Sequence, residues 1–320
     1  MATYTLGKML AANIQRKRRY KDRLAEKAMG LLTLGAIMLV PLIILALLVR
    51  AWPILSTKPL EELLFSTTWH PMKSAFGFYP FIMGTLWVTA LAMIISIPPS
   101  LLTATYLAEY APTQIRSLVK TFIDILAGIP SVVFGIWGVL IIVPFISRHL
   151  GYTLNRWLGI FPLFRNDNPT GYGLLAGGLV LAVMVFPIII SLAEEVISAV
   201  PHGLREASLS LGATRWQTLR CVVMRRSWSG VIAAVMLGFS RAFGETMAVM
   251  MVVGNVHQVP SSIFDPAYPL TALIANKYGE MMSIPLYDSA LLAGALILLL
   301  IVLFFNIASR LILTRLIRRE

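Results

Sequence analysis

Charge is scarce in this chain of 320 residues, where Asp, Glu, Lys and Arg make up 13% and hydrophobic residues 58%. Soluble domains contain about 25% charged residues, so this composition argues against one and indicates a membrane protein. Cysteine is scarcer still, because Cys221 is the only one. An internal disulfide and a Cys–His zinc site are therefore excluded, and we expect Cys221 to be a packing residue.

Motifs for nucleotide binding and hydrolysis are also missing. The one Gly-Lys pair, Gly7-Lys8, is followed by Met9 and not by the Ser or Thr of a phosphate-binding loop. No H-E-x-x-H or G-x-S-x-G run occurs. The four histidines lie far apart, in expected loops: His70, His149, His202 and His257. We therefore expect a non-catalytic chain with no metal ligands and no cofactor of its own.

Long apolar runs are what the chain has instead. Six of them have about the 20 residues that cross a hydrocarbon core of about 30 Å. They are Met29–Val49, Phe81–Thr103, Ile125–Ile146, Tyr172–Leu192, Gly230–Val253 and Ser289–Ala308. The sequence therefore predicts an all-α polytopic membrane protein.

Basic residues are unevenly distributed between these runs. With the N-terminus inside, 19 of the 27 Lys and Arg fall in cytoplasmic segments and 7 in external loops. This asymmetry predicts that both termini are cytoplasmic. The net charge of +12 is then explained by topology and anionic headgroups, and not by nucleic acid.

The spans define the expected organisation of the chain. Its segments are a basic N-terminal segment (1–28), a membrane anchor (29–49), an external loop (50–80), a five-helix core (81–312) containing a cytoplasmic loop (193–229), and a basic tail (313–320). The first segment is either a helix along the membrane surface or a disordered tail. The anchor has no convincing cleavage site after it, so we expect it to be uncleaved.

Two charges interrupt the fifth run, GVIAAVMLGFSRAFGETMAVMMVV. Arginine at the centre of a membrane helix costs about 2.5–3.5 kcal/mol, so Arg241 and Glu245 should face protein or water. Their four-residue spacing puts both side chains on one face of a continuous helix, within contact. The pair either neutralises itself and fixes helix packing, or lines a water-filled path in which Arg241 meets an anion. Thr246 either donates a hydroxyl there or bonds back to its own helix.

The third run contains AGIPSVVFGIWG, in which Pro130 removes a backbone hydrogen bond and Gly128, Gly135 and Gly138 loosen the helix. Broken helices in transporters often border the substrate path, where Ser131 would offer a hydroxyl. The alternative is a packing kink in which Ser131 satisfies a freed carbonyl.

The cytoplasmic loop reads VPHGLREASLSLGATRWQTLRCVVMRRSW, and Gly212 divides it into two short helical stretches, Leu204–Leu211 and Ala213–Val222. In the first stretch Leu204, Ala207, Ser208 and Leu211 recur at helical spacing, as in a helix that lies in a partner's groove. An ordinary surface loop remains the alternative.

The run EASLSLGATRWQTLRCVVMRR resembles the EAA loop of ABC importer permeases. Glu206, Ala207 and Gly212 match that loop, and Ser208 stands for its second alanine. Met224-Arg225 replaces the usual Leu-Pro. LAEYAP, LAGIPSVVFGIWG and RAFGETMAVMMVVGN are similar to the phosphate-specific permeases of the PstC type, and the resemblance covers roughly residues 80–310.

The resemblance implies a MetI-like permease fold in the bacterial inner membrane and the import of inorganic phosphate. It implies a loop that docks an ATPase through Glu206, Ala207, Ser208 and Gly212, and a substrate path with Arg241, Glu245, Thr246 and Ser131. The implied partners are a homologous PstA-type permease subunit, two ATPase subunits that carry ATP and Mg, and an external phosphate-binding protein. Membrane lipid surrounds the chain, and nucleic acid is not expected.

Several questions stay open at this level. Glu245 is hypothesised to hold Arg241 in place and to reject anions that have lost all their protons. Asp265, Lys277 and Glu280 are either contacts for the binding protein or solvated surface charges. The rival functions are a permease for another oxyanion or solute, a membrane sensor or scaffold that transports nothing, and a passive anion channel.

Overall fold

The computed structural model describes residues 2–280, 284 and 286–317, and it divides into two units after Arg50. Its elements in chain order are α1 (Ala2–Thr57), α2 (Leu60–Phe65), β1 (Trp69–His70), η1 (Pro71–Lys73), β2 (Ala75–Phe76), α3 (Tyr79–Glu109), α4 (Thr113–Gly128), α5 (Ser131–Trp137), η2 (Gly138–Ile142), α6 (Val143–Phe145), η3 (Ile146–Leu150), α7 (Gly151–Leu158), η4 (Pro162–Phe164), α8 (Leu174–Ser198), α9 (His202–Ser210), α10 (Arg215–Thr218), η5 (Leu219–Val223), α11 (Met224–Phe243), α12 (Met247–Val252), α13 (Leu270–Lys277) and α14 (Tyr287–Ile317).

The first unit is helical throughout its described residues. Residues 2–50 all belong to α1, so the basic segment continues into the anchor without a break. The basic segment is therefore helical and not a disordered tail, whereas its position along the membrane surface stays a prediction. The expected basic tail, 313–320, lies partly outside the described residues.

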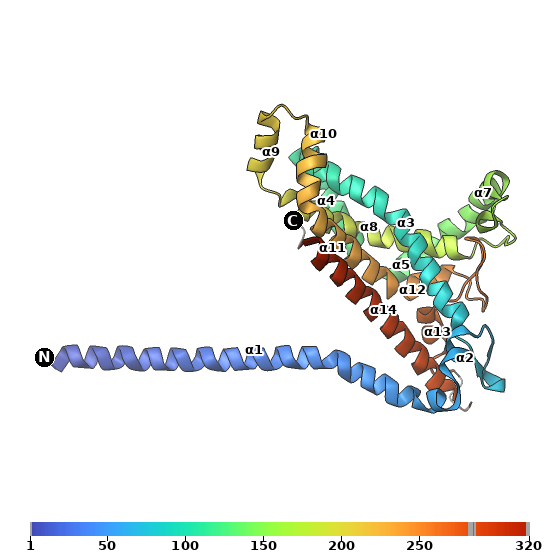
Figure 1. Cartoon of the computed structure of the whole chain (residues 1–320), viewed down its shortest axis with the longest axis horizontal. Helices are drawn as coiled ribbons and strands as arrows, with labels where there is room; N and C mark the ends of the chain where they lie inside the picture. The colour runs from blue at the N-terminus through green and yellow to red at the C-terminus, as the bar shows by residue number, and fades with distance from the viewer. Residues whose placement is uncertain (1, 281–283, 285, 318–320) are drawn as a thin grey trace. The chain divides into compact units, whose positions relative to one another are not determined.

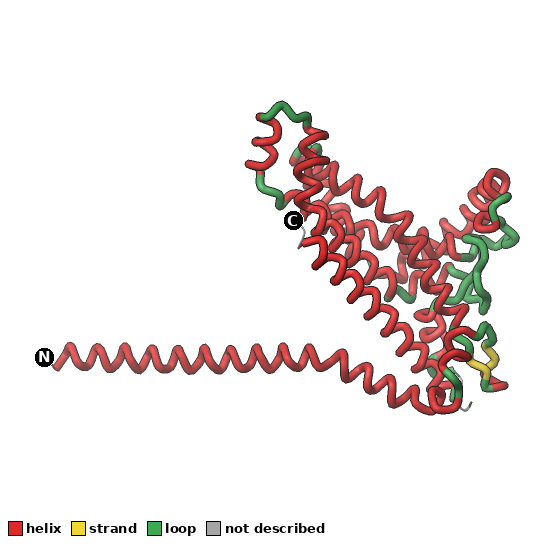
Figure 2. Tube along the Cα trace, viewed as in Figure 1, coloured by secondary structure: helices red, strands yellow, loops and turns green. Residues whose placement is uncertain are grey.

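Six helices of the described chain are long and apolar enough to cross a membrane, as predicted. They are Lys21–Thr57, Tyr79–Glu109, Ser131–Leu158, Leu174–Ser198, Arg215–Phe243 and Tyr287–Leu311. Figure 2 shows that, besides helices, the second unit contains only loops and the short β1–β2 hairpin among its described residues. The all-α architecture is confirmed.

The third span does not begin where its hydropathy predicts. We expected a helix from Ile125, but α4 ends at Gly128 and a new helix begins at Ser131. Ile129 is extended, with ψ of 129°, a geometry that the ring of Pro130 favours because it disfavours helical geometry in the residue before it. The chain is therefore interrupted at this point, and not merely kinked.

The fifth span is interrupted as well. The prediction of one helix over Gly230–Val253 is wrong, because α11 ends at Phe243 and α12 begins at Met247. Gly244 has φ of −90° and ψ of 0°, and Thr246 has φ of −119°, which lie outside the helical values. Pro98 and Pro99, in contrast, lie inside an unbroken α3.

The core of the second unit forms around α3, α8 and α11, which lie together in Figure 1. Val88 of α3, Val185 and Ile189 of α8, and Ala242 of α11 are buried in it. α9 and α10 lie at one end of this bundle (the α9–α10 end), while α2, the hairpin and α13 lie at the other (the β1–β2 end).

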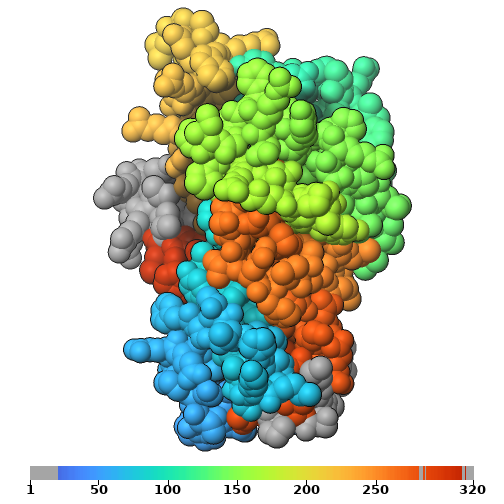
Figure 3. Space-filling model, turned by 90° about the vertical axis from the view of Figure 1, so that its right-hand side faces the viewer, coloured from blue at the N-terminus to red at the C-terminus, as the bar shows by residue number. Residues whose placement is uncertain are grey.

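Aromatic side chains hold the β1–β2 end together. Trp69 packs against Phe76, Phe78 and Phe81, with ring centroids 5.0–5.6 Å apart. Figure 3 shows the segment near residues 60–80 beside the segment near 255–280 on the same face. Two loops that are far apart in sequence thus form one lobe.

Candidate functional site

Glu245 lies in the break between α11 and α12, where it caps the second helix. Its Oε1 accepts the backbone N–H of Ala248 at 3.2 Å, one of the free donors of the first turn of α12. Its backbone carbonyl accepts the hydroxyl of Thr271 at 3.0 Å. Glu245 therefore stabilises the interrupted geometry itself.

A small cavity adjoins the Glu245 side chain. It is lined by Thr85, Val88 and Thr89 of α3, Leu181 of α8, and Thr271, and its volume is about 10 Å³. We call it the Glu245 cavity. Its volume is about that of a single water site, so phosphate does not fit in this conformation.

Arg241 is exposed in the last turn of α11. The expected contact with Glu245 is not present, since none of the ion pairs in the described part of the chain joins these two residues. The reason is geometric: a four-residue spacing brings side chains together only in a continuous helix, and this one ends at Phe243. The guanidinium is free to meet a ligand, solvent or partner.

The other two expected path residues have different surroundings. The Thr246 hydroxyl lies 3.5 Å from the Gly244 carbonyl, which is a contact within the break and not a bond back to its own helix. Ser131 is the first residue of α5 and is half-buried. Among the described residues its hydroxyl makes no hydrogen bond, so it does not satisfy a carbonyl freed by Pro130.

Glycines bring the two interrupted helices together. A Cβ on Gly135 of α5 would lie 3.2 Å from the Ala248 Cα of α12. A Cβ on Gly138 would lie 2.9 Å from the Val252 side chain. These glycines therefore permit the close approach of two helices, whereas the sequence suggested only that they loosen one.

The loop at the α9–α10 end has the two-helix form that was predicted, with shifted bounds. Gly212 between the helices has φ of +85°, a conformation that favours glycine. Thr214 and Gln217 form a reciprocal capping box at the start of α10. From there the chain is helical through Met224-Arg225 to Phe243, and Cys221, expected to be packed, is exposed.

The outer face of this loop carries apolar side chains. Leu211 is 89% exposed, and Leu204, Leu209 and Trp216 are exposed as well. Glu206 and Ala207 share this exposure, whereas the Ser208 hydroxyl is 2.9 Å from that of buried Thr218. Two faces of α9 thus differ, because Glu206 and Ala207 are exposed whereas Ser208 contacts α10.

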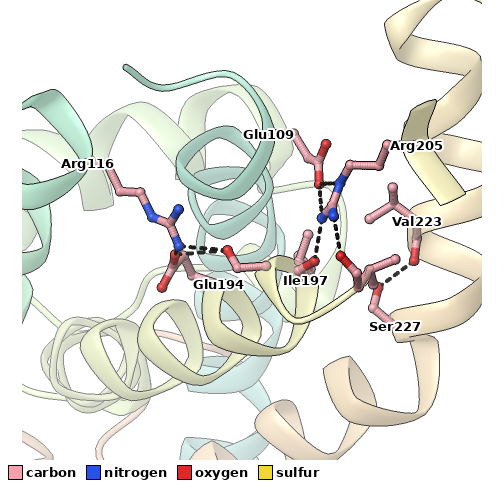
Figure 4. A network of polar contacts seen from close by, with 9 residues as sticks. Glu109, Arg116, Glu194, Ile197, Arg205, Val223 and Ser227 are labelled. Atoms are coloured by element: carbon pink, nitrogen blue, oxygen red, sulfur yellow. Dashed lines mark hydrogen bonds and ion pairs between the residues drawn. The ribbon is translucent and has the colours of Figure 1, made fainter. Parts of the chain in front are cut away.

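Two ion-pair clusters at the α9–α10 end were missed by sequence reasoning (Figure 4). Arg205 of α9 pairs with Glu109, the last residue of α3, at 2.7 Å. Arg116 and Lys120 of α4 both pair with Glu194 of α8, which is 3% exposed. In the sequence, the only sign of these ion pairs was Glu109, a single acidic residue at the end of an apolar run, in LAEYAP.

A cavity of about 440 Å³ is lined by Asn168, Tyr172, Met250 and Asn255 among others. Asp265 caps the loop beside it through the backbone N–H groups of Ser261 and Ser262, each at 2.8 Å. The Asp265 carboxylate therefore stabilises the geometry of this loop.

Lys277 and Glu280, the other two candidate contacts for the binding protein, form an ion pair with each other. The two charges are 2.8 Å apart, and this hydrogen bond with Glu280 raises the pKa of Lys277. His257 lies edge-on to Phe81 and Tyr268. Partial burial of the His257 imidazole lowers its pKa, and the nearby charges of Lys277 and His70 lower this pKa further.

Comparison with known proteins gives a consistent result. Residues 100–318 match the model of the family described as "Binding-protein-dependent transport system inner membrane component". The chain is 39% identical to the phosphate transport system permease protein PstC of Pasteurella multocida over 260 residues, 80% of this chain and 81% of that protein. It is 36% identical to PstC of Haemophilus influenzae over 298 residues, 92% of this chain and 93% of that protein.

Solved structures show the same fold at lower identity. An inward-facing form of the MetNI methionine ABC transporter aligns with a TM-score of 0.54 at 19% identity, covering 78% of this chain and 99% of that one. A bacterial ABC transporter for alginate aligns with a TM-score of 0.52 at 19% identity, covering 90% and 98%. These neighbours confirm the MetI-like permease architecture.

Proposed function

Since this chain belongs to the binding-protein-dependent transport system inner membrane components, and within them to the PstC type of phosphate permease, we propose that phosphate passes along its α11–α12 break. In this proposal Arg241 binds the anion and Glu245 controls which anions pass. The loop at the α9–α10 end docks an ATPase subunit, and both termini are cytoplasmic.

The observation that carries the proposal is the pairing of two interrupted helices. α5 begins after Pro130, α12 begins after Thr246, and glycines pack one against the other. Irregular backbone at membrane depth is tolerated where it is buried in protein or lines a water-filled path. In many transporters such interrupted helices form the substrate site.

Arginine suits a phosphate path for a chemical reason. Its planar guanidinium donates two parallel charge-assisted hydrogen bonds to two phosphate oxygens. Arg241 is exposed and holds no ion-pair partner among the described residues, which supports its availability for an anion. A second permease subunit facing it would complete the path.

Glu245 acts first as the cap of α12 and, once the Glu245 cavity opens, as a selector. Phosphate keeps a proton near neutral pH and can donate it to a carboxylate, whereas sulfate has no proton to donate. A carboxylate at this position would therefore accept phosphate and repel sulfate. With a volume of about 10 Å³ the cavity is too small for phosphate, so selection requires α3, α8 and α12 to separate.

The test is labelled phosphate uptake by the complex reconstituted in liposomes with its ATPase and binding protein, comparing Glu245→Gln with Glu245→Ala. The amide oxygen of Gln still accepts the Ala248 N–H, so Glu245→Gln should remain folded and lose only the charge. We expect it to admit sulfate, and Arg241→Ala to reduce phosphate uptake more than about tenfold, as loss of a charged bidentate contact would. Unchanged phosphate uptake and sulfate exclusion in Glu245→Gln would remove the selector role.

The same assay separates the remaining alternatives. Uptake that continues without ATP would indicate a passive channel, and no uptake in any condition would indicate a sensor or scaffold. Glu62→Gln, which breaks the exposed Lys58–Glu62 pair at 2.7 Å, is the matched control and should leave transport unchanged.

A further inference from the structure

The docking helix α9 is attached to the protein mainly by polar contacts. None of its residues is buried, and Leu204 and Leu209 are exposed. An apolar core therefore does not fix its orientation. Apart from the contact between Ser208 and Thr218, the fixing contacts converge on one side chain, Arg205.

The Arg205 guanidinium joins its own helix, α9, to two others, α3 and α8 (Figure 4). Nε and Nη2 donate to Oε1 of Glu109 at 3.0 and 2.7 Å, which joins α9 to the end of α3. Nη2 also donates to the Ile197 carbonyl at 2.9 Å, and Nη1 donates to the Val200 carbonyl. These last two contacts join α9 to the end of α8 and the turn after it.

This arrangement requires arginine. A guanidinium offers five donors in a rigid fork, whereas a lysine ammonium is a single point with three donors. The cation also lies at the C-terminus of α8, where the last carbonyls of the helix carry partial negative charge. Arg205 and Glu109 are 13% and 14% exposed, so water screens and replaces these contacts poorly.

The two helices bound by Arg205 are also walls of the Glu245 cavity. α3 ends at Glu109 and carries Thr85 and Thr89 at the cavity, about 30–36 Å away at 1.5 Å per residue. α8 ends beside Ile197 and contributes Leu181 to the same cavity. Arg205 at the α9–α10 end is therefore bonded to both of the helices that form these walls of the Glu245 cavity.

We propose that Arg205 and Glu109 are positioning residues for coupling, which make α9, α3 and α8 move together when an ATPase subunit displaces the docking loop. The displacement then reaches the Glu245 cavity along α3 and α8. This inference rests on the proposed docking of the ATPase, and it adds the side chains that transmit the movement.

The experiment uses the complete complex in liposomes and measures three quantities: retention of the ATPase subunit on purification, ATP hydrolysis, and phosphate taken up per ATP. In Arg205→Met we expect retention and hydrolysis to persist, while phosphate per ATP falls about 5- to 150-fold, the usual range of coupling between sites. Glu109→Gln is a milder variant of the same link and should show a smaller loss. Arg205→Lys should restore only part of the coupling, because one ammonium cannot hold all three elements.

Two control variants separate transmission from docking and from general charge loss. Leu211→Ser, at the exposed tip, should lose the ATPase subunit together with uptake. Asp167→Asn breaks an ion pair that is about 70% exposed and should change none of the three quantities.

The proposal is overturned if Arg205→Met and Glu109→Gln both keep the wild-type ratio of phosphate to ATP. It is also overturned if Arg205→Met loses the ATPase subunit as Leu211→Ser does, since Arg205 would then belong to the docking surface. If the wild-type complex shows no ATP-dependent phosphate uptake, the proposed function fails, whatever the variants do.

Discussion

The buried cluster around Glu194 makes a quantitative prediction about how α4 is held. Glu194 of α8 accepts hydrogen bonds from Arg116, from Lys120 at 3.0 Å and from Ser198 at 3.1 Å. Glu194→Gln keeps the volume of the side chain and removes the charge that both cations bind. We expect α4 to loosen from α8 and the free energy of unfolding to decrease.

The magnitude follows from the exposure of the three charges. Removing one partner from a fully buried ion pair costs about 3–5 kcal/mol, because the remaining charge stays buried. Here Arg116 and Lys120 are 36% and 45% exposed, so both recover part of their hydration. We therefore expect a loss of about 2–3 kcal/mol, somewhat below that range.

The assay is the melting temperature of the purified protein in detergent, for which this loss corresponds to a decrease of about 4–12 °C. Arg116→Met should cost more than Lys120→Met, since Arg116 also donates to Ser198 at 2.8 Å. The double variant of Glu194→Gln and Arg116→Met should be less destabilised than the sum of the two. Additive losses, or a Glu194→Gln protein that melts with the wild type, would refute this account.

Two further predictions concern packing and pH. Gly138→Ala would place a Cβ 2.6 Å from the Val180 side chain and 2.9 Å from the Val252 side chain. We therefore expect the free energy of unfolding, measured by thermal unfolding, to decrease by about 1–3 kcal/mol. Gly128→Ala, whose Cβ would have nothing within 4 Å, is the control and should leave it unchanged. Because the pKa of His257 is lowered in the folded state, the unfolded state binds more protons below about pH 6.5. The stability contribution of neutral His257 is therefore complete above that pH and is lost as the pH falls through the folded pKa. His257→Gln should make the melting temperature less dependent on pH between about 5 and 7; an unchanged pH profile would contradict this.

Hydropathy located the six spans because apolar length is a property that composition reveals directly. Hydropathy misplaced the start of the third span. Ile123, Ile125 and Leu126 of α4 lie before the break and are apolar, so the apolar run extends across it. The break at Gly244 was invisible for a related reason. Apolar residues continue on both sides of it, and glycine alone does not end a helix.

The contacts of the candidate site could not be predicted from the spacing of residues in the sequence. The prediction that Arg241 contacts Glu245 assumed an unbroken helix, and it was wrong because the helix is interrupted between them. The Arg205–Glu109 pair joins residues 96 positions apart, and no local pattern links them. The loop at the α9–α10 end was more predictable, since Gly212 and the Thr214–Gln217 capping box act within a few residues.

The shortness of α12 has a consequence for how the protein is made. Its six residues extend only about 9 Å, too short to enter a bilayer as an independent segment. α5, with the glycine surface that receives α12, is synthesised earlier and is already available when α12 emerges. The placement of α12 in the membrane therefore depends on the earlier folding of α5. A substitution that blocks that glycine surface should be visible during biosynthesis, as a topologically misassembled chain, before any defect in transport is measured.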